Sequence, residues 1–125
     1  HSGSPYEARY GFSRAVRVGS RIIVAGTAPI PSAGEALAEG AHDQMLRCGE
    51  IARRAIEELG GTLGDVVRTR MFLTDAADAD DVGRAHRTVF GEAAPAATMV
   101  VGALIDPAWR IELEVVAVVD DAAEA

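Results

Sequence analysis

Two glutamates near the C-terminal end of this sequence have the spacing and surroundings of groups that do chemistry. Glu112 and Glu114 share one side of residues 110–119, whose other side is apolar, and Val116 and Val118 continue the glutamate side. A side of this composition is expected to be partly covered rather than fully solvated. Partial burial perturbs a carboxyl pKa.

Arginines occupy a matching side of residues 66–74, where Arg68 and Arg70 lie beside Val66 and Phe72. If the two segments are neighbouring strands, an arginine of one pairs with a glutamate of the other across the ladder. Ion-pair networks and active sites perturb carboxylates alike, so structural pairing and a functional site both remain open for the glutamates.

Two further side chains, His86 and Cys48, have reactive chemistry but apolar surroundings. His86 lies between Val82 and Phe90 on one helical face, with no histidine or cysteine at ligand spacing, so it is a pocket residue or a packed core histidine. Cys48 lies on an apolar helical stripe where nothing nearby lowers its pKa, and it is interpreted as a small buried hydrophobic residue.

Four aspartates cluster at positions 75, 78, 80 and 81. They lack EF-hand spacing and the bidentate glutamate that closes a calcium loop. Carboxylates also gather at helix N-termini, where the helix dipole favours them, and this is the preferred interpretation. The sequence therefore predicts no metal site, and nothing in it calls for a cofactor.

The elements that position these residues follow the order β-β-α-β-α-β-β. Gly19-Ser20 is a two-residue hairpin signal between the first two strands, and residues 28–40 form a loop rich in proline and glycine. This order predicts an α+β domain with two helices on one face of a sheet. The expected strands are 10–18, 21–27, 66–74, 97–105 and 110–119, and the expected helices are 41–59 and a second one running to Phe90.

Composition restricts the class of protein. The 125 residues suit a single domain, predicted over residues 5–125, after a tag remnant at residues 1–4. All 12 basic residues are arginine, and the net charge of −7 disfavours a nucleic-acid partner. One cysteine excludes a disulfide framework, and the apolar stretches are too short to span a membrane. The expected location is the cytoplasm, and the acidic tail 120–125 is expected to fray.

Self-association is predicted by residues 97–105, because both sides of this expected strand are apolar. Two helices cover only one face of a five-stranded sheet. A second copy of the chain is the simplest cover for the other face, so a homo-oligomer is expected.

Several motifs together resemble the Rid (YjgF-like) family, also labelled endoribonuclease L-PSP or translation-initiation inhibitor. The resemblance extends in order from about residue 11 to residue 119. Its most specific part is PAATMVV at 95–101, followed at the family spacing by RIELE at 110–114. The other matching stretches are GFSRAV at 11–16, VAGTAP at 24–29, DVVRTRMFLTD at 65–75 and FG at 90–91.

This resemblance implies a chorismate-mutase-like α+β fold with a mixed sheet. It also implies a homotrimer whose sheets form a central barrel, with three ligand clefts between subunits. The best-known family activity is hydrolysis of enamine and imine intermediates, such as 2-aminoacrylate, to 2-keto acids and ammonia. Such a site needs a fixed cation for the substrate carboxylate and a positioned water.

Compared with the family pattern, this chain keeps the catalytic glutamate as Glu112 but has Ala97 where the carboxylate-clamping arginine belongs. Phe12, Thr27 and Ala77 also depart from the usual tyrosine, glutamine and asparagine. The clamp supplies two ionic hydrogen bonds, each worth about 1.5–3 kcal/mol, so its loss predicts weak deaminase activity. The residues that the resemblance implies as cleft lining are Phe12, Gly26, Thr27, Ala97, Thr98 and Met99, and the cations that would compensate are Arg14, Arg70 and Arg110.

The expected function is that of a homotrimer that binds or hydrolyses an unidentified small metabolite between subunits, with Glu112 as its polar anchor or base. One alternative is an enamine/imine deaminase with a relocated cation. The other is the endoribonuclease or translation inhibitor of the family label, which an acidic chain with few aromatics does not favour.

Overall fold

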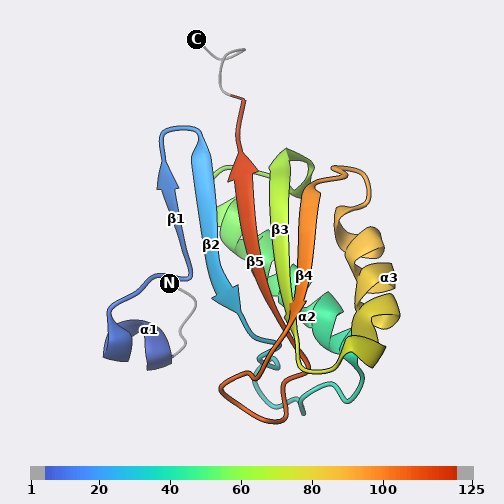
Figure 1. Ribbon diagram of the computed structural model, residues 1–125. Helices are drawn as coiled ribbons and strands as arrows, with labels where there is room; N and C mark the ends of the chain where they lie inside the picture. The colour runs from blue at the N-terminus through green and yellow to red at the C-terminus, as the bar shows by residue number, and fades with distance from the viewer. Residues whose placement is uncertain (1–4, 121–125) are drawn as a thin grey trace.

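The computed structural model describes residues 5–120 (Figure 1). The tag remnant expected at residues 1–4 and the tail at 121–125 lie outside the described residues. Among the described helices, none is long and apolar enough to cross a membrane. The helices are α1 Pro5–Tyr10, α2 Ala41–Glu58 and α3 Ala79–Phe90, and the strands are β1 Ala15–Val18, β2 Arg21–Thr27, β3 Val66–Leu73, β4 Ala96–Val101 and β5 Ile111–Val118, with 3₁₀ turns at Leu63–Asp65 and Ala76–Asp78.

The five strands form one mixed sheet in the order β1-β2-β5-β3-β4. Every neighbouring pair is antiparallel except β3 and β4, which run parallel. Figure 1 shows α2 crossing behind the strands, and buried side chains of α2 and α3 join those of the sheet in one core. The predicted α+β domain with two helices on one face of a mixed sheet is confirmed.

Alternation along β5 decides which residues face the helices. Its buried positions are those of Ile111, Leu113, Val115 and Ala117, while Glu112 and Glu114 lie on the opposite, open face, as the sequence predicts. The expected arginine side of β3 is partly wrong. A register shift between Val66 and Arg68 turns Val66 into the core, because a bulge reverses the alternation at that point.

The N-terminal segment also differs from the prediction, because residues 5–10 form α1 rather than leading into a strand that starts at Tyr10. Pro5 begins this helix, where a missing N–H is no loss. Gly11 ends it with φ of 76°, a conformation that glycine adopts without strain. The amides of Gly11 and Phe12 both donate to the carbonyl of Glu7, which satisfies the end of the helix.

Strand β4 is shorter and less covered than the sequence predicts. It ends at Val101 instead of Ile105, and Ile105 is 88% exposed. All six β4 residues are exposed in the single chain, because β4 is an edge strand with β3 on one side only. The apolar pattern that predicted a strand buried on both faces is therefore unsatisfied within one chain.

Helices α2 and α3 lie close together at Gly49. A methyl group added to Gly49 would lie 2.9 Å from Cγ2 of Val89 on α3, closer than carbon atoms pack. The β-branched side chain of Val89 cannot easily turn aside. The close contact between the helices at this position therefore depends on glycine having no side chain.

Alanine at Gly49 is expected to destabilise the fold by about 1–3 kcal/mol, although alanine normally stabilises a helix, because the added methyl overpacks the contact with Val89. Gly83→Ala on α3 is the matched control, since its nearest neighbour would be 3.7 Å away. Urea unfolding measures both, and Val89→Ala should restore the Gly49→Ala variant. A neutral or stabilising Gly49→Ala would contradict this packing.

Candidate functional site

Glu112 and Gly26 meet where β5 begins and β2 ends. A methyl group on Gly26 would lie only 3.0 Å from Oε2 of Glu112, so the carboxylate occupies space that another residue's side chain would take. The β2–β5 register shifts between Val24 and Thr27, and this irregularity includes Gly26. The bulge and the glycine together admit a half-buried carboxylate beside the backbone.

Arg14 joins this pair from the segment before β1. Its Nη2 donates to the carbonyl oxygen of Gly26 at 2.8 Å, and its guanidinium lies 5.7 Å from the centre of the Phe12 ring. Arg14 is only 9% exposed, so the contact with Gly26 holds a mostly buried cation against the bulge. The structure thus brings together Phe12, Arg14, Gly26 and Glu112, and we call these four residues the Glu112 cluster.

Burial of the Glu112 cluster disfavours the charged forms of both Glu112 and Arg14. Burial raises the pKa of Glu112, the Arg14 charge partly opposes that rise, and the nearby Glu114 adds to it. Burial also lowers the pKa of Arg14, against the attraction of Glu7 and Glu112. A carboxyl group whose pKa is raised toward neutrality is suited to accept or return a proton.

Gln44 on α2 holds the backbone segment just before Glu112 by hydrogen bonds. Its Oε1 accepts from the Arg110 amide at 2.7 Å, and its Nε2 donates to the carbonyls of Ala38 and Ala108 at 2.8 and 3.2 Å. Gln44 is fully buried, so these bonds satisfy its whole amide. Sequence reasoning missed this residue, although a glutamine four residues before Cys48 on an apolar stripe is a detectable signal.

Ala97, Thr98 and Met99 lie on β4, away from the Glu112 cluster. Strand β3 separates β4 from β5, and Ala97 is in register with Thr69, whose side chain is buried under the helices. Met99 reaches toward Gly83 of α3. Within one chain, the expected lining residues other than Thr27 therefore lie in two groups: the Glu112 cluster, and β4 at one edge of the sheet.

The arginines considered as compensating cations have different partners. Arg70 lies opposite Glu114 and pairs with it at 3.5 Å, which confirms the ladder pairing that the sequence predicts. Nε of Arg110 lies 3.2 Å from Oδ2 of Asp78, an ion pair without good hydrogen-bond geometry. Arg14 forms no ion pair with any residue between 5 and 120.

Of the remaining candidates, Thr27 and Cys48 are buried in the fold and His86 is half-buried. Thr27 is fully buried, and its hydroxyl donates to the Ala25 carbonyl rather than facing an open surface. His86 bonds the Thr69 hydroxyl at 2.8 Å, and burial lowers its pKa. Cys48 is completely buried, which raises the pKa of its thiol and confirms its place in the core.

The aspartate cluster lies where α3 begins, as the helix-terminus interpretation predicts. Asp75 accepts from the Ala77 amide, while Asp80 and Asp81 pair with Arg84 one turn later. Asp78 precedes the first turn of α3 and pairs with Arg110. Each carboxylate thus has a partner within its own neighbourhood.

Comparison with known proteins agrees with this architecture. The family model described as endoribonuclease L-PSP matches residues 3–119. An uncharacterized protein of Streptomyces coelicolor is 41% identical over 117 residues, covering 91% of this chain and 86% of that protein. The 2-iminobutanoate/2-iminopropanoate deaminase of Salmonella typhimurium is 29% identical over 110 residues, covering 86% of each chain.

A solved structure from Mycobacterium tuberculosis, of a member of the YjgF/YER057c/UK114 family, superposes with a TM-score of 0.86 and 38% identity. The match covers 94% of this chain and 95% of that one. Fold, motifs and relatives therefore agree, and this chain belongs to the endoribonuclease L-PSP (YjgF, Rid) family.

Proposed function

We propose that the chain acts as a homotrimer that binds or hydrolyses a small metabolite in clefts between subunits. The observation that carries the proposal is the separation of the candidate residues into the Glu112 cluster and strand β4. A site that contains both groups needs β4 of one copy against the Glu112 cluster of the next. Each cleft is then made by two subunits.

The exposed surface of β4 supports this assembly. Met99, Val100 and Val101 are 38%, 45% and 57% exposed at the free edge of the sheet. Apolar residues in a row on an edge strand favour association, because both their side chains and their backbone groups lack partners. A further copy of the chain would cover them, and the sheets of three copies would then enclose a barrel.

Glu112 is the group best suited to act on a bound molecule. Its carboxyl lies half-buried against Gly26, so its position is fixed by the backbone rather than by a flexible surface. In a cleft it anchors a donor group of the ligand or orients a water for attack on a C=N carbon. The lining residues expected on β4 are uncharged. A cleft without a cation on that side favours a ligand less acidic than a 2-imino acid.

Efficient deamination of 2-aminoacrylate is not expected of this chain. The Salmonella relative is named for imine deamination, but the family arginine that would grip the substrate carboxylate is replaced here by Ala97. Losing two charge-assisted bonds of about 1.5–3 kcal/mol each removes two to four powers of ten in binding or rate.

A deaminase with a relocated cation is the second candidate, and Arg14 favours it. Arg70 and Arg110 pair with Glu114 and Asp78, whereas Arg14 has no acidic partner among the described residues and its charge acts directly on Glu112. Under this alternative, Arg14 supplies the cation that Ala97 lacks.

The two candidates are separated by following pyruvate release from 2-aminoacrylate generated in situ. We expect no rate above buffer for the parent chain and a clear gain for Ala97→Arg, because the guanidinium fork restores the clamp. Ala97→Lys, which adds charge without the fork, should gain less. Parent activity that Arg14→Gln abolishes would instead establish the relocated cation.

Replacing Glu112 by glutamine is expected to raise the thermal midpoint at pH 7. The folded pKa of Glu112 is raised, so the unfolded chain loses this proton first and stability falls as pH rises above about 4.5. The gain from Glu112→Gln should therefore vanish below about pH 4.5. Glu114→Gln is the control and should not stabilise, because it breaks the pair with Arg70. A destabilising Glu112→Gln at pH 7 would contradict the account.

Native mass spectrometry tests the assembly. Three copies of the 13.1 kDa chain are expected in the complex. Val101→Asp on β4 should shift the mass to a single chain with an unchanged circular dichroism spectrum, because it buries an unpaired charge at the interface. A monomeric parent chain would overturn the proposed cleft.

A further inference from the structure

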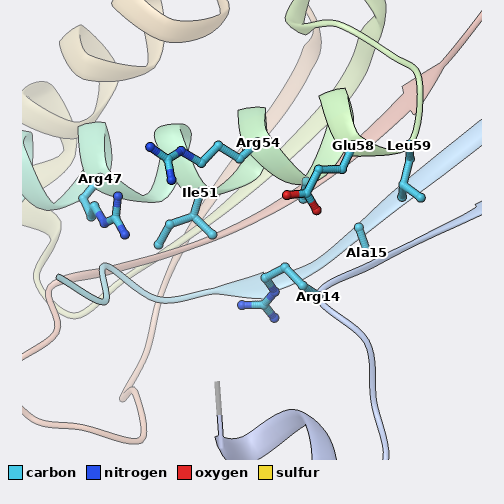
Figure 2. A pocket seen from close by; sticks show the side chains of 8 residues that line it. Arg14, Ala15, Arg47, Ile51, Arg54, Glu58 and Leu59 are labelled. Carbon is cyan, nitrogen blue, oxygen red and sulfur yellow. The ribbon is translucent and has the colours of Figure 1, made fainter. Parts of the chain in front are cut away.

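A separate hollow lies on the helix side of the sheet, between α2 and the start of β1. Figure 2 shows Arg47, Ile51 and Arg54 reaching into it from α2, with Arg14 on the side of β1. The hollow has a volume of about 250 Å³. Three arginines and one glutamate, Glu58, are its charged lining, which makes it locally positive on a chain of net charge −7.

Each of the three arginines is held by one fixed contact. Nη2 of Arg14 bonds the Gly26 carbonyl at 2.8 Å, and Nε of Arg47 bonds the Ile30 carbonyl at 2.6 Å. Nε of Arg54 pairs with Glu50 at 3.1 Å. These contacts position the stems and leave further N–H groups of all three guanidinium groups without a partner among the described residues. A ligand that accepts hydrogen bonds would find unused donors on all three, and that of the buried Arg14 is already oriented.

Arg14 shows the clearest need for a counter-charge. It is nine-tenths buried, it makes no ion pair within residues 5–120, and its Nε is buried without a hydrogen-bond partner. Burying a charge is unfavourable unless a partner compensates it. Glu7 and Glu112 attract the Arg14 charge without forming an ion pair with it, and an anion in the adjoining hollow would add a direct contact.

We propose that this hollow binds the phosphate group of a small phosphorylated metabolite. Its volume is below the roughly 300–1,000 Å³ typical of pockets for drug-sized ligands, so it suits a compact group. Guanidinium forks match phosphate oxygens in geometry and charge. Arg54 pairs with Glu50, whereas Arg14 and Arg47 make no ion pair within residues 5–120, and the several oxygens of a phosphate can accept from more of these N–H groups than the two oxygens of a carboxylate. Ile51 and Leu59 form an apolar wall beside the charged end.

The hollow shares Arg14 with the Glu112 cluster, but its other two arginines do not belong to that cluster. Arg47 and Arg54 lie on α2 and take no part in the Glu112 cluster, so their substitution tests the hollow alone. If the chain forms a trimer but does not bind phosphate, the phosphate site is wrong and the proposed metabolite cleft still stands. If the chain binds phosphate but is monomeric, the cleft is wrong and the phosphate site still stands.

Inorganic phosphate is the probe, and its binding is measured by isothermal titration calorimetry and by the thermal midpoint of the protein. Sodium chloride of matched ionic strength and sodium acetate are the comparison salts. Phosphate should raise the midpoint more than either salt, because a ligand of the folded state stabilises it. Arg47→Gln and Arg54→Gln should each weaken phosphate binding about tenfold or more, since each removes a charge-assisted contact.

Arg53→Gln is the matched control. Arg53 is next to Arg54 on α2, but it forms ion pairs with Glu50 and Glu57 and does not line the hollow. It should bind phosphate as the parent chain does. An equal loss in Arg53→Gln, an equal midpoint shift with acetate, or no shift beyond that of sodium chloride would each overturn the site.

Discussion

The half-burial of Glu112 against Gly26 is the constraint on which the rest of the site depends. A carboxylate in this position needs a residue without a side chain opposite it, and the β2 bulge presents Gly26 there. Arg14 holds the Gly26 carbonyl, and Gln44 fixes the Arg110 amide two residues before Glu112. Burial raises the pKa of Glu112, which means that its ionised form is less stable here than in water. The same burial holds the carboxyl group in a defined position.

Sheet order determines what one chain provides by itself. Because β3 lies between β5 and β4, the Glu112 cluster and the motif at Ala97–Met99 do not meet within a chain. The parallel β3–β4 pair leaves the apolar β4 at a free edge, where its side chains are exposed. The proposed assembly, with a second copy of the chain against this edge, would account both for the exposed apolar surface and for the division of the candidate residues.

Much of this architecture is predictable from local pattern. Alternation along residues 110–119 placed Glu112 and Glu114 on one face and indicated the Arg70–Glu114 pair, because strand periodicity is independent of tertiary detail. Alternation does not reveal bulges, so Val66 was assigned to the wrong face. The α1 helix was missed because six residues carry too little periodicity.

The site was predictable only in part, for a related reason. The family motif identified Glu112, Gly26 and Ala97, but a linear sequence does not say that two of them share a cluster and the third lies on another strand. Arg47 and Arg54 are ordinary helix-surface positions in sequence, and only the packing of α2 against the sheet brings them near Arg14.

Mixed assembly of two chains that are each expected to be inactive tests the central claim most directly. One chain carries Ala97→Arg with Glu112→Gln, and the other is the parent, so neither alone combines a guanidinium at position 97 with the Glu112 carboxylate. If clefts form between copies, refolding the two together should release pyruvate from 2-aminoacrylate at a rate that neither chain shows alone. An inactive mixture alongside an active Ala97→Arg single variant would contradict the account, because the two groups would then act within one chain.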